Sequence, residues 1–446
     1  MPCCRKNAAW PQNRDDTMQT ETTAHSGPLV IPPGKGLLIN RNFTLLAIGQ
    51  AISNLGDFVY STTLLVWVYT LNHTAMAVSG VMLAQYAPIF VLGPIAGVFV
   101  DRWNRRSTMI ISDLARAAIA LLPLLVPSAV RLPAIYASVF LLSFCSRFFT
   151  PARSGILQAI VAPEQQGQAA AVGQATFALS IVIGPTLATP LYFLVGPTIA
   201  VSINATSFIV SALCVALIRA PREALHPYAF QREQAEAKGL RAIGKELVSG
   251  LHFVLTTRIL FMVTVMALIA MFGSGALNAL DIIFVSQRLH ISTAYYGPLM
   301  AVGGAGTLLG AIVAGLLVRK IRPQRILTGS IILIGLGFIL YALQTHYLAA
   351  LIVIFFAMIP QGGIDVGFAP LLINTTPAAI IGRVMSVFET CMYGMSLLSA
   401  ALAGYLGQLY PVYLILAVSG IILTLSGIFG WFAIPNTVAE LSQNSR

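Results

Sequence analysis

Long apolar runs separated by short polar segments fill the chain from residue 43 to residue 433. Each run is long enough to cross a hydrocarbon core of about 30 Å as an α-helix. Because lipid offers the backbone no hydrogen-bond partners, helices are the expected structure. The pattern predicts an all-α, polytopic membrane protein of twelve helices, with these boundaries: 43–69, 76–100, 108–130, 132–155, 168–194, 197–218, 258–286, 293–318, 325–345, 347–373, 384–409 and 412–433.

A polar linker divides these helices into two sets of six. We therefore expect five parts: a disordered cytoplasmic tail (1–40), a six-helix bundle (41–219), a cytoplasmic linker (220–257), a second six-helix bundle (258–433) and a cytoplasmic tail (434–446). The linker has apolar residues at helical spacing with charged residues between them, which predicts an amphipathic helix on the inner membrane surface. A simple tether is the competing interpretation. Met18 is an alternative start to Met1.

Two local repeats relate the halves. The second predicted helix ends with Gly97-Val-Phe-Val-Asp101-Arg102, and the eighth ends with Gly315-Leu-Leu-Val-Arg319-Lys320. Likewise, the segment 163–167 before the fifth helix resembles the segment 377–382 before the eleventh. Duplicated six-helix halves predict a pseudo-symmetric transporter with its binding site between them.

Composition supports a membrane protein. Of the 446 residues, 57% are hydrophobic and only 9% are charged, so a water-soluble core cannot bury this much apolar surface. The net charge of +11 arises from Lys and Arg residues spread over short loops, which argues against nucleic-acid binding. With the N-terminus inside, only Arg131 and Arg288 fall in outer loops, and Arg116 lies within a helix. This distribution predicts an even number of spans with both termini in the cytoplasm.

The first helix carries a polar stripe. Gln50, Asn54, Asp57 and Ser61 follow one another at steps of three or four residues, which places them on one helical face, together with Ser53. We expect this face to line a central cavity. Asp57 lies near the middle of the helix, where a carboxylate is costly unless it serves transport or is hydrogen bonded. A proton or cation site and a helix-packing acid are both consistent with it.

Other charged residues within the predicted helices are also site candidates. In the seventh helix, Ser274, Asn278 and Asp281 form a second polar stripe, and Asp281 lies nearer the outer surface, where it could form an outer gate. Arg147 in the fourth helix could bind an anion or pair with Asp365 or Glu389. Ion pairs that close the cytoplasmic side and direct substrate contact are the two interpretations of this group.

The loop after the second helix is the most specific local motif. It reads Gly97-x-x-x-Asp101-Arg102-x-Asn104-Arg105-Arg106. Asn104 is the best substitute for glycine where a turn needs a positive φ, so we expect that conformation there. Asp101 could contact the opposite half in one transport state only, which makes the loop a candidate cytoplasmic gate.

This loop resembles the signature between helices two and three of the major facilitator superfamily, with Asn104 in place of the usual glycine. Other stretches are similar to the branch that holds macrolide-efflux proteins and the enterobactin exporter. These are Ser53-Asn54-Leu55-Gly56-Asp57, Ser112-Asp113-Leu114-Ala115-Arg116 and Pro151-Ala152-Arg153-Ser154. The resemblance covers residues 43–433.

The resemblance implies a proton-driven, multi-pass exporter that works by alternating access in a bacterial inner (plasma) membrane. Its cargo would be a hydrophobic or amphipathic small molecule, such as a drug, a macrolide or a siderophore-like compound. Gly184-Pro185 in the fifth helix is similar to the antiporter signature of the superfamily, although Ser180, Ala188 and Thr189 stand where glycines are expected. The implied partners are the cargo, protons and the lipid bilayer, with no obligatory protein partner.

Other functions remain as alternatives. Import or export of a polar metabolite is the first, and a membrane-embedded enzyme is the second. The histidines lie in the tail, in the linker or at helix ends, without the spacing of a metal site or a catalytic pair. We therefore expect no enzyme activity, no metal and no cofactor. Gly239 to Lys245 matches GxxxxGK, but Glu246 replaces the Ser or Thr that a nucleotide-binding loop requires.

Overall fold

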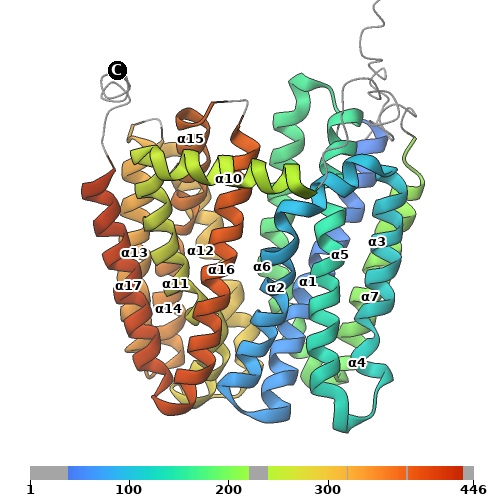
Figure 1. The fold of residues 1–446 in the computed structure, drawn as a ribbon. Coiled ribbons are helices and arrows are strands. Elements are labelled where there is room, and N and C mark those ends of the chain that lie inside the picture. Colours follow the sequence, from blue (N-terminus) through green and yellow to red (C-terminus); the bar gives the residue numbers. More distant parts are fainter. Residues whose placement is uncertain (1–38, 220–239, 319, 378–379, 435–446) are drawn as a thin grey trace, which may run out of the picture. The chain divides into compact units, whose positions relative to one another are not determined.

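The computed structural model describes residues 39–219, 240–318, 320–377 and 380–434. Within these ranges the chain is helical, and the helices form two groups (Figure 1). The first group comprises α1 (Arg41–Asn72), α2 (Ala75–Arg102), α3 (Arg105–Ala120), α4 (Leu122–Leu125), α5 (Arg131–Ile160), α6 (Gln166–Val195) and α7 (Pro197–Ala216). The second comprises α11 (Arg258–Gln287), α12 (Tyr296–Leu317), α13 (Pro323–Ala342), α14 (Tyr347–Met358), α15 (Gln361–Thr375), α16 (Ile381–Leu409) and α17 (Val412–Ala433).

The described helices support the predicted twelve spans. Eleven segments are long and apolar enough to cross a membrane. Helix α1 supplies the twelfth, because its 32 residues reach about 48 Å and its lower hydropathy comes from its polar stripe. Two predicted helices are interrupted: residues 108–130 form α3 and α4, and residues 347–373 form α14 and α15 with a break at Pro360. Proline explains both interruptions, since it lacks the backbone N–H that continues a helix.

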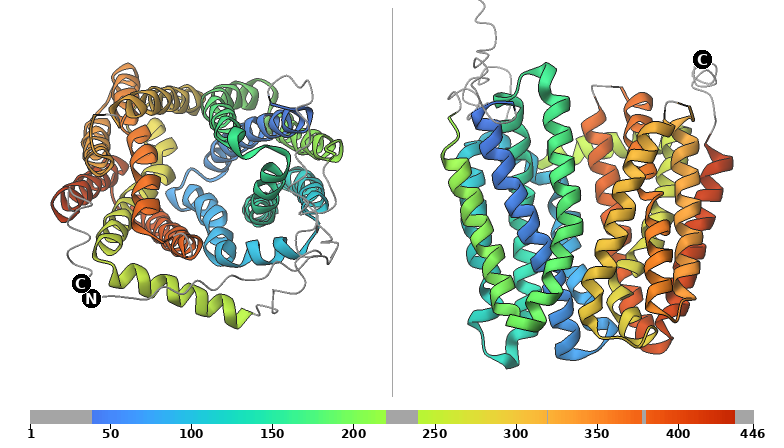
Figure 2. Two further views of the ribbon diagram at one scale, coloured as in Figure 1. Left: turned by 90° about the horizontal axis from the view of Figure 1, so that it is seen from above. Right: turned by 180° about the vertical axis from the view of Figure 1, so that it is seen from behind.

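The two halves repeat one packing pattern. In the first, α1 packs against α6 and α7, while α3 packs against α5 and α7. In the second, α11 packs against α16 and α17, while α13 packs against α15 and α17. Seen from above, the two sets lie side by side (Figure 2). The same set of neighbours in each half is the pseudo-symmetry that the local sequence repeats predict.

Contacts between the halves fall mainly on two helix pairs. Helix α2 packs against α16, and α6 packs against α12. These pairs occupy equivalent positions in the repeat, namely the second with the eleventh span and the fifth with the eighth. The relative position of the two halves therefore depends on these interfaces.

Helix α10 (Leu240–Thr256) lies in the segment that the sequence assigns to the linker. It packs against α16 and α11, with further contacts to α2. Gly250 lies against the backbone of Arg383, at the start of α16, and Arg383 donates a hydrogen bond of 3.5 Å to Ser249. The helix is thus attached to the N-terminal end of α16, one of the helices at the interface between the halves (Figure 1).

Candidate transport cavity

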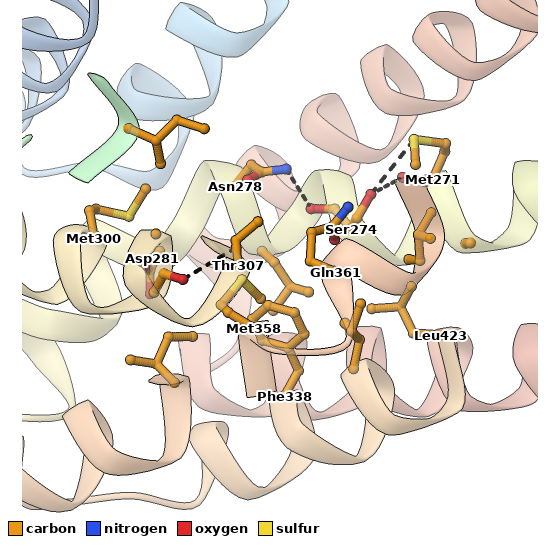
Figure 3. A pocket seen from close by; sticks show the side chains of 18 of the residues that line it. Met271, Ser274, Asn278, Asp281, Met300, Thr307, Phe338, Met358, Gln361 and Leu423 are labelled. Carbon is orange, nitrogen blue, oxygen red and sulfur yellow. Dashed lines mark hydrogen bonds between the residues drawn. The ribbon is translucent and has the colours of Figure 1, made fainter. Parts of the chain in front are cut away.

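A cavity of about 480 Å³ lies between the two halves. The first half contributes residues of α1, α2 and α6, and the second contributes residues of α11 to α17. Figure 3 shows Ser274, Asn278 and Asp281 following one another along α11 at the cavity wall. A volume of this size is within the range that binds small organic molecules.

The lining is mostly apolar. Six methionines contribute to it: Met82, Met266, Met271, Met300, Met358 and Met392. Aromatic rings come from Phe58, Tyr86, Tyr296, Phe338 and Phe368. The described lining contains a few amides and hydroxyls, and its one charged residue is Asp281. Such a wall suits a molecule with a large apolar body and few polar groups.

Asp281 is held by the buried phenol of Tyr341, which donates a hydrogen bond of 2.7 Å to its Oδ1. Tyr296, which is 2% exposed, lies within electrostatic range of the same carboxylate. The Asp281 side chain itself is half-buried, and it lines the cavity. Neither tyrosine was among the site residues that the sequence indicates, because each is remote from Asp281 along the chain and only the fold brings them together.

The outer side of the cavity is closed by small residues at both interfaces between the halves. A Cβ atom on Gly404 of α16 would lie 2.8 Å from Cβ of Ser79 in α2, and one on Gly407 would lie 2.7 Å from Cβ of Ala75. On the other interface, Gly297 of α12 packs directly against the Pro185 carbonyl of α6. By the direction of each helix, all these residues lie near the outer ends. Residues 62–69, in the outer part of α1, are also buried without interruption.

At the inner ends of α6, α12 and α16, the glycines that the structure describes have no such contacts. Nothing lies within 4 Å of a Cβ atom placed on Gly167 or Gly173 of α6, on Gly315 of α12 or on Gly382 of α16. Much of the inner part of α6 is exposed, whereas Pro185 and Thr189 are buried. In the described part of the chain, the close glycine contacts between the halves therefore gather toward the outer ends of the helices, as the predicted topology orients them.

The polar stripe of α1 is divided between different surroundings. Ser61 lines the cavity, as do Asn278 and Asp281. Gln50 instead accepts a hydrogen bond of 3.2 Å from Arg153 of α5, and Ser53 is buried. Asn54 and Asp57 are half-buried and are not among the residues that line this cavity. The expectation that the whole stripe faces the cavity is therefore wrong for this cavity, because close packing of α1 against α7 turns most of the stripe inward.

Asp57 belongs to a buried cluster inside the first half. Asn204 of α7 lies beside it, and Asp113 and Arg116 of α3 lie within electrostatic range. Arg116 forms an ion pair with Asp113, and its guanidinium stacks over the ring of Phe149 at 4.3 Å from the centroid. The predicted burial of Arg116 is confirmed at 4% exposure. The sequence indicated Asp113 only as part of a stretch that resembles a known family. It did not predict that Asp113 lies near Asp57.

The structure brings Arg147 and Glu389 to a common neighbour. Both lie within electrostatic range of Tyr393 in α16, whose ring is 5.8 Å from that of Tyr86 in α2. Arg147 lies within α5, and Glu389 is exposed. The side chain of Asp365, the other suggested partner, lies outside the described part of the structure.

The loop between α2 and α3 departs from one expectation. Asn104 has φ −66° and ψ 112°, an extended conformation rather than the positive φ that the sequence suggested. Its side chain caps α3 by accepting a hydrogen bond of 2.9 Å from the backbone N–H of Ser107. An N-cap needs an asparagine oxygen and no left-handed backbone, which is the physical reason for the correction.

Arg105 and Arg106 attach this loop to neighbouring helices. Arg105 donates a hydrogen bond of 3.3 Å to the carbonyl of Gly155 in α5, and Arg106 donates one to the carbonyl of Ala216 in α7. The side-chain surroundings of Gly97, Asp101 and Arg102 lie outside the described residues. The gate function of this motif therefore stays a prediction.

Gly184 and Pro185 are both buried in α6. Gly184 packs directly on Phe58 of α1, while Pro185 meets Gly297 across the interface between the halves. Both residues of this motif therefore lie at close contacts between helices. Gly306 and Gly310 of α12 also lie at a close helix contact, where they pack on the carbonyls of Phe355 and Ile359.

Two six-helix halves around a cavity at their interface define a polytopic transporter, and comparison with known proteins makes the class specific. A sequence profile of the Major Facilitator Superfamily matches residues 46–399 and 263–446. The chain belongs to this superfamily, so it is a multi-pass membrane transporter and not an enzyme.

Proteins of similar sequence are also transporters of this superfamily or exporters by name. The chain is 28% identical to the uncharacterized MFS-type transporter YfiS of Bacillus subtilis, over 88% of this chain and 92% of the relative. It is 26% identical to macrolide efflux protein A of Streptococcus pyogenes, over 65% of this chain and 70% of the relative. A shorter match at 30% identity covers 40% of this chain and 44% of the putative bacilysin exporter BacE of Bacillus subtilis.

Solved structures share the fold. The nucleoside transporter NupG matches with a TM-score of 0.72 at 13% identity, over 87% of this chain and all of the other. A bacterial homologue of the iron transporter ferroportin, in an inward-facing state, matches with a TM-score of 0.68 at 15% identity, over 89% of this chain and 99% of the other. At such identities these likenesses concern the architecture alone.

Proposed function

We propose that the protein is a proton-coupled exporter of hydrophobic or amphipathic small molecules in the plasma membrane. The observation that carries this proposal is the mostly apolar cavity between the halves, and the close contacts toward the outer ends of the helices favour entry from the cytoplasmic side. A cargo would enter from the cytoplasm or the inner leaflet. It would be released outside when the outer contacts of the pairs α2–α16 and α6–α12 open and contacts form at the inner ends of the same helices.

The relatives support export. The names of macrolide efflux protein A and of the bacilysin exporter each state outward movement of a small organic molecule. A polar metabolite is a poorer match to this cavity, because methionines, leucines and isoleucines dominate the wall and would leave its hydroxyl groups without hydrogen bonds.

We assign the proton site to the cluster of Asp57, Asp113 and Arg116. Two carboxylates and one guanidinium carry one excess negative charge, and a bound proton would neutralise it. The cluster lies within the first half and apart from the lining of the cavity, so a proton and a cargo can occupy the protein at separate positions. Because the neighbours come from α1, α3 and α7, a change of charge there would alter the packing of α1.

The test is cargo uptake into everted membrane vesicles energised by respiration. Macrolides, lipophilic dyes and siderophores form the panel, with and without a protonophore. Wild-type protein should accumulate cargo in the vesicles, and the protonophore should abolish accumulation. A cargo that accumulates equally with the protonophore present would refute proton coupling.

The first variant for this assay is Asp57→Asn, which removes the carboxylate and keeps its shape. We expect proton-driven accumulation to fall to background, while cargo still equilibrates down its own gradient. Glu164→Gln, an equal charge change at an exposed residue between α5 and α6, should transport like the wild type. Full proton-driven accumulation by Asp57→Asn would remove this residue from the coupling mechanism.

A further inference from the structure

The charge of the cavity is distinctive. Among the lining residues that the structure describes there is no lysine, arginine or histidine, and the only carboxylate is Asp281. In the part of the chain described, no cation forms an ion pair with it. Asp57, by contrast, has Arg116 within electrostatic range. Asp57 and Asp281 therefore have different surroundings, and among the described residues Asp281 has no countercharge from the protein.

The geometry leaves Asp281 available to a ligand. Tyr341 donates to Oδ1 from a fully buried position, which fixes the carboxylate, and no second hydrogen bond to Asp281 is made by the described residues. Asp281 lines the cavity and remains half-buried. A carboxylate in an apolar surrounding is costly unless a positive charge pairs with it, so the missing countercharge favours a cation in the cavity.

Aromatic rings add to this preference. Tyr296 lies beside Asp281, and Phe338 contributes to the wall of the same cavity (Figure 3). The face of an aromatic ring attracts organic cations, most strongly where water is excluded. The six methionines supply a deformable apolar surface that can follow bodies of different shape.

We infer that the cargo of this cavity is an amphipathic organic cation, which places its positive charge at Asp281 and its apolar body among the methionines. This inference rests on the proposed export function and narrows it to one class of substrate. Because Asp281 lies in the outer third of α11, the charged group would point toward the outer closure and the apolar body toward the cytoplasm. Asp281 is then a specificity-determining residue that contacts the cargo.

The experiment compares two probes of nearly equal size and shape and of opposite charge, tetraphenylphosphonium and tetraphenylborate. Their binding to purified full-length protein in lipid nanodiscs is measured by equilibrium dialysis, with empty nanodiscs as the blank. Wild-type protein should bind the phosphonium saturably and should not bind the borate above the blank. Asp281→Asn should weaken phosphonium binding by about tenfold or more, because it removes a charge that contacts the ligand.

Two further variants separate a binding role from a folding role. Asp281→Glu keeps the charge and should restore part of the affinity. Tyr341→Phe removes only the hydrogen bond to Oδ1, and it should change phosphonium affinity less than Asp281→Asn does. Each purified variant should elute as one monodisperse species at the volume of the wild type in size-exclusion chromatography, which shows that it is folded.

The inference is overturned if wild-type protein does not bind the phosphonium, if it binds both probes equally, or if Asp281→Asn leaves phosphonium affinity unchanged. Export of neutral amphipathic molecules in the vesicle assay would still support the proposed function in each of these cases. If no cargo is exported at all, the proposed function itself fails, so the two failures can be told apart.

Discussion

At the scale of single residues, the membrane-embedded charges have different structural roles. Arg116 and Asp113 form an ion pair deep in the first half, and Arg116 is also stacked between the rings of Phe149 and Phe208. Asp281 lines the cavity, and among the described residues its one hydrogen bond comes from Tyr341. A sequence pattern that marks intramembrane charges cannot separate these cases, because the difference lies in the neighbours that each side chain acquires on folding.

Arg116→Ala should destabilise the protein strongly. The substitution leaves Asp113, which is completely buried, without its partner, and breaking such a pair costs about 3–5 kcal/mol. The measurement is the thermal midpoint of unfolding in detergent. Lys320→Ala, at an exposed residue between α12 and α13, is the control and should leave the midpoint unchanged. Equal midpoints for Arg116→Ala and wild type would show that the pair is not structural.

At the scale of elements, the sequence was a good guide to the helices and a poorer guide to how they break and pack. Apolar length located the spans, because a helix that crosses lipid must be apolar over most of its length. It did not place the interruption at Pro360 between α14 and α15, where the apolar run continues without a polar residue until Gln361. The polar stripe of α1 was found correctly, but its orientation depends on the packing against α7, which the chain's own periodicity does not reveal.

The break in the tenth span lies where α12 approaches most closely. Gly310 of α12 packs directly on the carbonyl of Ile359, so Gly310→Ala should force the helices apart and cost about 1–3 kcal/mol. Gly315→Ala, one turn further along the same helix, meets nothing within 4 Å and is the matched control. Thermal unfolding should show a lower midpoint for the first variant only. A similar midpoint for both variants would contradict the close packing.

At the scale of the whole transporter, alternating access requires the closed outer contacts to open. The sequence indicated two similar halves and a site between them, and both follow from the duplicated motifs. It could not indicate which side is closed, because that depends on contacts such as Ser79 with Gly404 and Gly297 with Pro185, which join residues far apart in the chain. The same limit applies to Tyr341 and Tyr296, which complete the surroundings of Asp281.

A cross-link across the outer closure should stop transport. Ser79→Cys and Gly404→Cys bring two thiols together, because a Cβ atom placed on Gly404 would lie 2.8 Å from Cβ of Ser79. A modest separation of the helices would therefore permit a disulfide. Oxidation should abolish cargo accumulation in everted vesicles, and a reductant should restore it. Each single cysteine variant should remain active under oxidation. Undiminished transport by fully cross-linked protein would mean that the outer contact does not have to open.

The most direct test of the account is the accessibility of the cavity from each side of the membrane. Asn278→Cys places a thiol on the cavity wall, in a chain whose five native cysteines are replaced. A membrane-impermeant maleimide is applied to everted vesicles and to right-side-out vesicles. Each kind of vesicle is labelled once with cargo present and once with cargo absent. The account predicts rapid labelling from the cytoplasmic side and protection by an exported cargo. Labelling only from the outside, or cytoplasmic labelling that no exported cargo reduces, would contradict it.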